Sequence, residues 1–399
     1  MNSGWKKLKI KEFTKVLSGG TPKSSVVEYY EGGTIGWITP SDLTGYNRQF
    51  ISKGRRNITN LGLEKSAAKL LPAGTVLFSS RAPIGHVVIA ENELTTNQGF
   101  KNILPSSMHN PKYLYWYLKS VKDEIEFRAS GTTFKEISGS EMNEIEIPLP
   151  SLEEQTKIVA VLDKAQTLIK KRKEAIVKLD ELIKSVFLDM FGDPLTNSKC
   201  LPTKKLNDIG KIQTGNTPPR KEEEYYGNHI EWIKSDNINT PYHYLTTATE
   251  YLSEFGMKVG RYAPENSILV TCIAGSKECI GNSAIADRTV AFNQQINAIT
   301  PYEDVNPYFL YVQFLVGKKL VQQASTNGMK GLISKSKFQE ISFLYPSYKE
   351  QKKFGDIFIE INNQRSSMEK SLQYIQMNFN SLLQRAFKGE LEIDMEVTT

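Results

Sequence analysis

The sequence predicts an α+β chain in which two similar globular blocks are each followed by a long helix, and the two helices pair as an antiparallel coiled coil. Three observations predict this fold class. Residue landmarks recur at an offset of about 196 positions, a heptad pattern of apolar residues follows each block, and both blocks mix short β-like runs with helical and turn-rich segments. Two copies in one polypeptide predict a pseudo-twofold internal repeat.

The recurring landmarks keep the same order in both halves of the chain. Each first-copy landmark returns in the second copy: Thr21-Pro22 as Thr217-Pro218, Tyr29-Tyr30 as Tyr225-Tyr226, Trp37 as Trp232, Ser41-Asp42 as Ser235-Asp236, Asn97-Gln98 as Asn293-Gln294, Asn110-Pro111 as Asn306-Pro307, and Glu154-Gln155 as Glu350-Gln351. This order divides the chain into a first block (1–150), a first helix (151–194), a second block (195–346), a second helix (347–391) and a tail (392–399).

Within the blocks, short runs rich in β-branched and apolar residues predict strands near 74–78, 86–90 and 267–270. Aromatic-rich segments that begin at Pro111 and Pro307 predict a helix near 111–121 and another near 307–316. Aromatic side chains at helical spacing are more often part of a core than a platform for stacked bases. We therefore assign them to packing.

The two long helices are predicted from apolar residues at alternating spacings of four and three. The first seam is Ile158, Leu162, Ala165, Ile169, Arg172, Ile176, Leu179, Ile183, Val186 and Met190; the second is Phe354, Phe358, Ile361, Arg365, Met368, Leu372, Ile375, Phe379, Leu382 and Ala386. Such a repeat is typical of a coiled coil. Ser151 and Ser347 are predicted N-caps, each with a glutamate three residues later, and Gly192 and Gly389 are predicted to end the helices.

Charge is distributed unevenly between blocks and helices. Residues 1–150 carry 19 Lys and Arg against 14 Asp and Glu, and residues 195–346 carry 16 against 14. The stretch 151–194 has 8 of each, and 347–399 has 7 against 8. The positive excess therefore lies in the blocks, which favours a polyanion-binding surface there. A solvated basic face without a ligand is the alternative.

Other features of the sequence point to a cytoplasmic protein without a metal site. Three cysteines without a Cys-x-x-Cys pair are typical of idle thiols in a reducing compartment. No signal-peptide pattern occurs at the start, and no apolar run reaches the roughly 18 residues of a membrane span. The 4 histidines are scattered without metal-ligand spacing. We expect no membrane partner.

Candidate DNA contacts are polar and basic residues in the loops of both blocks. Arg pairs with guanine, Asn and Gln pair with adenine, and Ser, Thr and Lys also bind phosphates. The candidates are Arg55, Arg56, Ser80, Arg81, Thr132, Thr133 and Lys135 in the first block, and Arg220, Lys221, Asn237, Lys277, Asn327 and Lys330 in the second. Within the first block, Arg81 and Lys135 rank first, and the alternative for Arg81 is that it braces its own loop against an Asp or Glu. For Asn97-Gln98 and Asn293-Gln294, a turn held by hydrogen bonds is slightly favoured over base contact.

The sequence contains none of the common catalytic motifs. None of its 27 glycines forms a Gly-x-Gly, which excludes a dinucleotide fingerprint and the glycine loop of an S-adenosylmethionine fold. No Gly-Lys-Ser/Thr occurs, so a P-loop is excluded. Asn216-Thr217-Pro218-Pro219 only superficially resembles the Asn-Pro-Pro-Tyr of adenine methyltransferases, because an extra residue interrupts it and no aromatic residue follows. We expect no catalytic residues and no cofactor in this chain.

The doubled order of these landmarks resembles that of the specificity (S) subunits of type I restriction-modification systems. The resemblance covers nearly the whole chain and includes the Ile147-Pro148-Leu149-Pro150 segment that leads into the first helix. It implies two target-recognition domains, each of which reads one half of a split double-stranded DNA site in defence against foreign DNA. It also implies two methyltransferase (M) subunits that use S-adenosylmethionine, and restriction (R) subunits that use ATP and Mg²⁺.

Two other hypotheses remain at this point. A stand-alone DNA methyltransferase or nuclease would bind S-adenosylmethionine as an isolated chain. A coiled-coil scaffold protein without a DNA role would show no DNA binding, with or without a methyltransferase partner. The second block also departs from the first where Phe343-Leu344-Tyr345-Pro346 replaces the more proline-rich segment, which leaves the entry angle of the second helix open.

Overall fold

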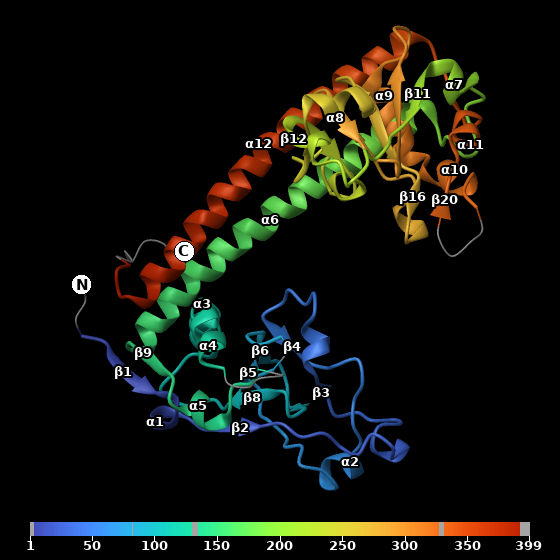
Figure 1. Ribbon diagram of the computed structural model, residues 1–399. Helices are drawn as coiled ribbons and strands as arrows, with labels where there is room; N and C mark the ends of the chain where they lie inside the picture. Colours follow the sequence, from blue (N-terminus) through green and yellow to red (C-terminus); the bar gives the residue numbers. More distant parts are fainter. Residues whose placement is uncertain (1–3, 82, 130–134, 327–330, 392–399) are drawn as a thin grey trace. The chain divides into compact units, whose positions relative to one another are not determined.

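The computed structural model describes residues 4–81, 83–129, 135–326 and 331–391 of the chain. It divides into two compact units (Figure 1): residues 1–171 with 371–399, and residues 172–370. The long helices α6 (Leu152–Phe191) and α12 (Tyr348–Phe387) each contribute to both units. Each unit therefore combines one globular block with part of both helices.

The first unit is built around a five-stranded sheet of order β2-β8-β5-β6-β4, with two further strand pairs, β1–β9 and β3–β7. Its strands are β1 (Lys6–Lys9), β2 (Val16–Ser18), β3 (Trp37–Ile38), β4 (Phe50–Ile51), β5 (Val76–Ser79), β6 (Val87–Ala90), β7 (Thr95–Thr96), β8 (Phe100–Ile103) and β9 (Glu146–Leu149). Its block helices are α1 (Ile10–Phe13), α2 (Asn60–Glu64), α3 (Pro111–Ser120), α4 (Lys122–Arg128) and α5 (Gly139–Asn143), with 3₁₀ turns η1 (Val27–Tyr29) and η2 (Pro40–Leu43).

The second unit repeats this plan with a four-stranded sheet of order β11-β19-β15-β17. Its strands are β10 (Thr203–Lys205), β11 (Gly210–Thr214), β12 (Tyr226–Ile233), β13 (Tyr251–Leu252), β14 (Tyr262–Ala263), β15 (Ile268–Thr271), β16 (Ile273–Ala274), β17 (Ser283–Ile285), β18 (Val290–Phe292), β19 (Ile296–Pro301), β20 (Gly331–Leu332) and β21 (Ser342–Leu344). Its block helices are α7 (Leu206–Ile209), α8 (Glu254–Val259), α9 (Pro307–Val316), α10 (Lys318–Gln323) and α11 (Lys335–Gln339), with η3 (Glu223–Tyr225), η4 (Ser235–Asn237) and η5 (Lys277–Cys279).

The predicted elements of the blocks are confirmed. Strands β5, β6 and β15 lie where the apolar runs predict them, and α3 and α9 begin at the predicted prolines. In both helices an asparagine precedes the proline: the side-chain oxygen of Asn110 accepts a hydrogen bond from the Lys112 N–H, and that of Asn306 accepts one from Tyr308. The repeated Asn-Pro landmark is thus a helix start.

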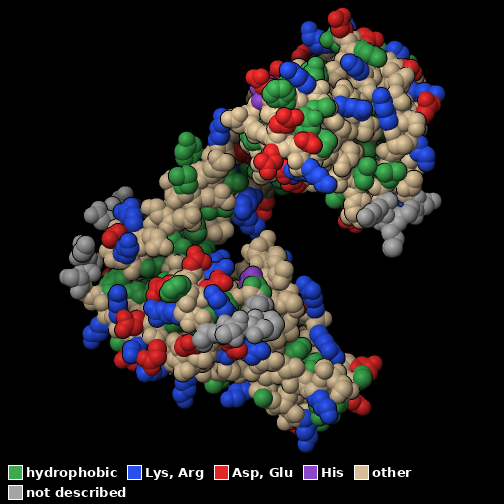
Figure 2. Space-filling model, in the orientation of Figure 1, with side chains coloured by type: hydrophobic (Ala, Val, Ile, Leu, Met, Phe, Trp, Pro, Cys, Tyr) green, Lys and Arg blue, Asp and Glu red, His purple; other side chains and the backbone are tan. Residues whose placement is uncertain are grey.

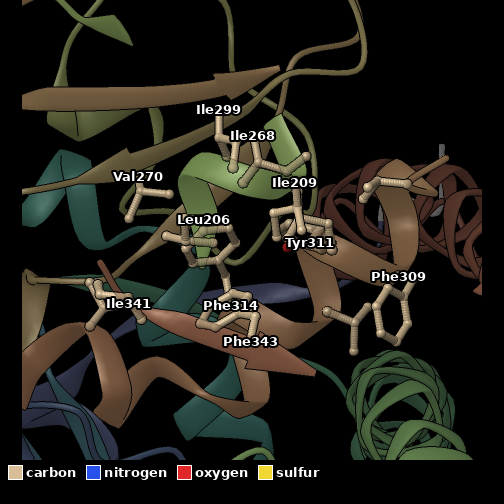
Figure 3. Packing of buried hydrophobic residues seen from close by; sticks show 14 of the residues in the cluster. Leu206, Ile209, Ile268, Val270, Ile299, Phe309, Tyr311, Phe314, Ile341 and Phe343 are labelled. Atoms are coloured by element: carbon tan, nitrogen blue, oxygen red, sulfur yellow. The ribbon is translucent and has the colours of Figure 1, made fainter. Parts of the chain in front are cut away.

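Each block shares one hydrophobic core with both long helices. Alternate residues of β15 point to opposite sides of the sheet, so that Ile268 and Val270 face the helices while Leu269 faces a second, smaller core. Figure 3 shows the side chains of β15, β19 and α9 meeting in the larger core of the second unit. Burial of each large apolar side chain stabilises the fold by about 1.5–3 kcal/mol.

The two long helices pair in antiparallel orientation within each unit, as predicted. In the first unit, Ile158 and Leu162 near the start of α6 share a core with Leu383 and Ala386 near the end of α12. In the second, the Phe187 ring lies 5.4 Å from the Phe354 ring. The predicted seam side chains are all buried or half-buried: Ile158, Leu162, Ile169, Ile176, Leu179, Ile183, Phe354, Phe358, Ile361, Leu372, Ile375, Phe379 and Leu382.

Both long helices begin with the predicted capping box. The Ser151 hydroxyl accepts a hydrogen bond from the Glu154 N–H, and the Glu154 carboxylate accepts one from the Ser151 N–H at 3.1 Å. Ser347 and Glu350 repeat both bonds. Positive φ angles of 76° at Gly192 and 69° at Gly389 follow the last helical turns, and glycine adopts such angles without steric strain.

The arginine inside the second seam is held by a buried ion pair. Arg365 is 4% exposed, and its Nε donates to Asp180 of α6 at 2.7 Å. A second nitrogen donates to the Pro241 carbonyl of the block at 2.8 Å. His243 Nε2 lies 3.1 Å from the same Asp180 oxygen. Burial opposes ionisation, but His243 and Arg365 lower the pKa of the Asp180 carboxyl below its ordinary value. Polar contacts thus connect the second block to both long helices.

A fully buried glutamine joins each block to the start of its long helix. The Gln155 side chain accepts a hydrogen bond from the Asn110 N–H at 2.8 Å and donates to the carbonyls of Met108 and Pro150. Gln351 repeats the bonds to Asn306 and Pro346. The glutamines recur in the sequence because each satisfies the same buried backbone groups.

Replacement of Gln155 by Ala should destabilise the first unit by about 2–3 kcal/mol, because it leaves several buried backbone groups unpaired. Urea denaturation of the full chain measures the loss, and faster hydrogen exchange at the Asn110 amide locates it. Lys164→Ala, at an exposed position of the same helix, is the matched control. Equal stability of the two variants would show that the glutamine bonds are dispensable.

Candidate nucleic-acid interface

A tyrosine–tryptophan pair, called the clamp below, holds the Thr-Pro segment of each block by hydrogen bonds. In the first unit, the Tyr30 hydroxyl donates to the Pro22 carbonyl at 2.6 Å, and the Trp37 ring nitrogen donates to the Gly20 carbonyl at 3.0 Å. The two rings meet edge to face at 5.7 Å. Most of the early landmarks therefore serve the scaffold rather than a ligand.

The second unit repeats this clamp. The Tyr226 hydroxyl donates to Pro218 at 2.7 Å, the Trp232 ring nitrogen donates to Asn216 at 3.3 Å, and the rings lie 6.1 Å apart. Because the pair of bonds and the ring packing recur, the Thr-Pro segment is held in an equivalent way in both units.

An arginine stacks on the clamp in both units, although it comes from a different part of each block. The Arg56 guanidinium carbon lies 3.5 Å from the centre of the Tyr30 ring. That of Arg220 lies 4.9 Å from the Tyr226 ring and 4.8 Å from the Trp232 ring. Both arginines are exposed at the surface. A guanidinium held over an aromatic ring by a cation–π contact can still donate hydrogen bonds to phosphate or base acceptors.

Neighbouring charges distinguish the two stacked arginines. Arg220 donates to the Glu250 carboxylate at 2.6 Å, and this bond raises the pKa of the guanidinium. In the first unit it is Arg55, next to the stacked arginine, that faces a carboxylate: its Nε lies 3.8 Å from Asp42 while its side chain stays 74% exposed. Arg55 and Arg56 therefore form an exposed cationic pair at the clamp of the first unit.

The Asn-Gln landmark forms a turn in both units. The Asn97 side-chain oxygen accepts a hydrogen bond from the Gly99 N–H at 2.9 Å, and that of Asn293 accepts one from the Gln295 N–H at 3.1 Å. The Gln98 side-chain oxygen accepts a hydrogen bond from the Thr21 hydroxyl, and the Gln294 oxygen accepts one from the Thr217 hydroxyl. These contacts confirm the interpretation of the landmark as a turn.

Arg81 lies in a cluster of three charges. Its backbone forms an antiparallel bridge with Glu136, and its guanidinium reaches the Glu136 carboxylate at 3.4 Å. Lys101, in strand β8 between β2 and β5, reaches the same carboxylate at 3.2 Å although its side chain is only 7% exposed. Neither Lys101 nor Glu136 was identified from the sequence. A lysine between buried residues of a strand was the available signal, because such a charge requires a partner.

The other predicted contacts fall into three groups. Exposed side chains at the surface of their units are Lys135, Lys221 and Lys277. Ser80 is fully buried and Asn237 is 7% exposed, so neither side chain lies at the surface; the Asn237 amide bonds instead to Thr246 and Thr247. Thr132, Thr133, Asn327 and Lys330 lie outside the described residues.

On the visible face, Figure 2 shows Lys and Arg interspersed with Asp and Glu over both units. Within residues 4–81, 83–129, 135–326 and 331–391, no group of His, Cys, Asp and Glu could hold a metal ion. A search of the same residues finds no helix suited to crossing a membrane.

Comparison with known proteins identifies a family model that matches the chain twice. The model of the type I restriction modification DNA specificity domain matches residues 2–178 and 201–377. The type I restriction enzyme MjaIX specificity subunit of Methanocaldococcus jannaschii is 39% identical over 251 residues, which span 59% of this chain and 58% of that protein. The EcoR124I/EcoR124II specificity subunit of Escherichia coli is 30% identical over 184 residues, or 45% of this chain and 44% of that protein.

Two solved structures share the fold over nearly the whole chain. A chain from a structure concerning complex assembly and conformational transition of the type I R-M system has a TM-score of 0.62 at 16% identity, and covers 98% of this chain and 99% of its own length. The type I restriction-modification S subunit from M. genitalium has a TM-score of 0.55 at 18% identity, with coverage of 97% and 96%. The two curated relatives named above, in contrast, are matched over 58% and 44% of their own length.

The turn assignment of Asn97 can be tested by two substitutions. Asn97→Asp keeps the acceptor for the Gly99 N–H and should leave the free energy of unfolding nearly unchanged, whereas Asn97→Ala should lower it by about 1 kcal/mol. Thermal unfolding of both variants gives the comparison. If Asn97 instead read adenine through its amide donor, Asn97→Asp would abolish DNA binding without loss of stability.

Proposed function

The chain belongs to the type I restriction modification DNA specificity domain family, and on this basis we propose that it is the DNA-recognition subunit of a type I restriction-modification complex. Each unit reads one half of a split double-stranded DNA site. The chain itself performs no catalysis. It positions two methyltransferase subunits and the restriction subunits on the DNA, in the cytoplasm where foreign DNA enters.

The observation that carries this proposal is a common scaffold with different surface chemistry. The Tyr–Trp clamp, the Asn-Gln turn and the buried glutamine recur in both units with the same hydrogen bonds. The exposed cations do not recur: Arg55 and Arg56 of the first unit have no basic counterpart in sequence, and Arg220 occupies the second clamp from another loop. Two similar domains with different contacts suit two different half-sites.

The cofactors of the reaction are assigned to the partners. The sequence lacks the glycine-rich loops that commonly bind S-adenosylmethionine and ATP. In this proposal the methyltransferase subunits bind S-adenosylmethionine, and the restriction subunits bind ATP and Mg²⁺. A stand-alone methyltransferase or nuclease and a scaffold without a DNA role are the rival functions. Mapping of methylated bases in cells with the complete system, and in cells that lack this chain, separates all three.

An exchange of one block should change one half of the recognised site. If residues 1–150 are replaced by the equivalent block of a relative, methylome sequencing should show a new first half-site with the second half-site unchanged, because the contacts of each block come from its own loops. The reciprocal exchange of residues 195–346 is the control. A change in both halves after either exchange would show that the two units do not read DNA independently.

A heptad inserted in both long helices should lengthen the spacer between the half-sites. The division between the units passes between Lys171 and Arg172 in α6 and between Lys370 and Ser371 in α12. Insertions at these points keep each unit whole. Seven residues preserve the seam and add about 10.5 Å of helix, equivalent to up to about three base pairs.

The spacer length in methylated sites measures the effect of this insertion, and the half-site sequences should stay the same. A five-residue insertion at the same points is the control, because it breaks the apolar seam and should lower stability instead. An active heptad variant that methylates sites with the parental spacer would exclude the helices as the spacing element.

A further inference from the structure

The cluster of Lys101, Glu136 and Arg81 in the first unit contains two unequal ion pairs. The Lys101 side chain is 7% exposed, and its ammonium lies 3.2 Å from the Glu136 carboxylate. A buried ammonium without a counterion is strongly destabilising. Lys101 therefore requires a counterion, and Glu136 lies in the position to provide it.

The second ion pair of the cluster is easily broken. The Arg81 side chain is 42% exposed, and it approaches Glu136 only to 3.4 Å. An exposed ion pair of this kind contributes little to stability. Since Lys101 already neutralises Glu136, the positive charge of Arg81 is not needed to balance the cluster. Arg81 can leave the carboxylate without leaving an unpaired buried charge behind.

The backbone around Arg81 holds its position independently of this ion pair. Arg81 and Glu136 form a backbone bridge, and the Ile137 N–H donates to the Ser80 carbonyl at 3.0 Å. The guanidinium can therefore rotate away while its own Cα stays fixed. Its Nε is buried and has no hydrogen-bond partner among the described residues.

The second unit forms the same backbone pairing without the charges. Ile273 pairs with Leu332 where Arg81 pairs with Glu136, and the Ile333 N–H donates to Cys272 as Ile137 does to Ser80. Asn297 faces Val270 in the sheet, where Lys101 faces Phe78. The fold therefore does not require the three charges at these places. Their presence in one unit alone points to a role in what that unit binds.

We propose that Glu136 is a specificity-determining residue of the first unit, which holds Arg81 in the free protein and releases it to a guanine in the first half-site. This inference rests on the proposed function and names a residue and a base for it. The O6 and N7 atoms of guanine offer two acceptors that replace the carboxylate for the guanidinium. A base without this pair of acceptors leaves Arg81 on Glu136, and the carboxylate repels nearby phosphates.

The primary test is Glu136→Gln in the full chain, co-expressed with its methyltransferase partners. The complex should bind DNA with a scrambled first half-site about 2- to 5-fold more tightly, the factor that an exposed ion pair contributes. Affinity for the methylated site identified in cells should change less, so the specificity ratio falls. Methylome sequencing should show relaxed choice at one guanine position of the first half-site and an unchanged second half-site.

The matched control is Glu144→Gln, which removes the same charge from the same unit. Glu144 pairs with the exposed Lys9 and Lys11 and is half-exposed itself, and its substitution should leave the specificity ratio unchanged. An unchanged ratio in Glu136→Gln would overturn the proposal. So would an equal loss of affinity for both DNA duplexes together with a lower melting temperature, because this combination marks a purely structural role.

A second variant decides the question if Glu136→Gln fails to fold. The triple substitution Arg81→Ile, Lys101→Asn and Glu136→Leu installs the side chains that the second unit carries at the same places. It should fold, as judged by thermal unfolding, and should lose the preference at one guanine position alone. Retention of that preference would overturn the proposal. A parental complex that methylates no split site would refute the proposed function itself, which separates the two failures.

Discussion

The shared core between each block and the paired helices is the interaction on which the rest of each unit depends. Phe187 and Phe191 of α6 and Phe354 and Phe358 of α12 lie in the same buried cluster as the strands and helices of the second block. Removal of either helix would expose one side of the sheet. The helices are therefore part of the fold of each block rather than linkers, and the surface loops inherit their positions from this core.

Buried polar bonds specify how each block sits on its helices. Gln155 and Gln351 each accept from an asparagine N–H and donate to a proline carbonyl, whereas the helix carboxylates do not correspond. Asp163 accepts hydrogen bonds from Gln49, Lys112 and Trp116 in the first unit. Asp180 serves Arg365 and faces His243 in the second. Such networks are costly when incomplete, so they favour one arrangement over alternatives of similar hydrophobic burial.

The sequence predicted those features that arise from periodicity or from local bonds. The heptad seam predicted both helices, the order of block and helix along the chain predicted their antiparallel pairing, and the capping residues predicted their starts. The composition of the two units was not predictable, because the first unit joins residues 1–171 to residues 371–399, and the boundaries of the continuous second unit, residues 172–370, fall inside the two long helices. The buried charges were also missed. Nothing in the local sequence indicates that Lys101 and Glu136 meet, since their contact depends on the pairing of β8 with β5 and on the bridge at Arg81.

The candidate contacts show the same division between scaffold and surface. Ser80 and Asn237 resembled readers of DNA by residue type, but both are buried, and the Asn237 amide bonds to Thr246 and Thr247 of its own block. Residues that recur in both copies hold the backbone, and the exposed residues Arg55, Arg56 and Lys277 differ between copies. A domain whose backbone is held by such recurring residues can change its target through a few surface side chains, because these side chains do not make the bonds that fix the loops. The Arg81 cluster fits this logic: the second unit makes the same strand pairing with Ile273 and Leu332, so the backbone tolerates new chemistry at that place.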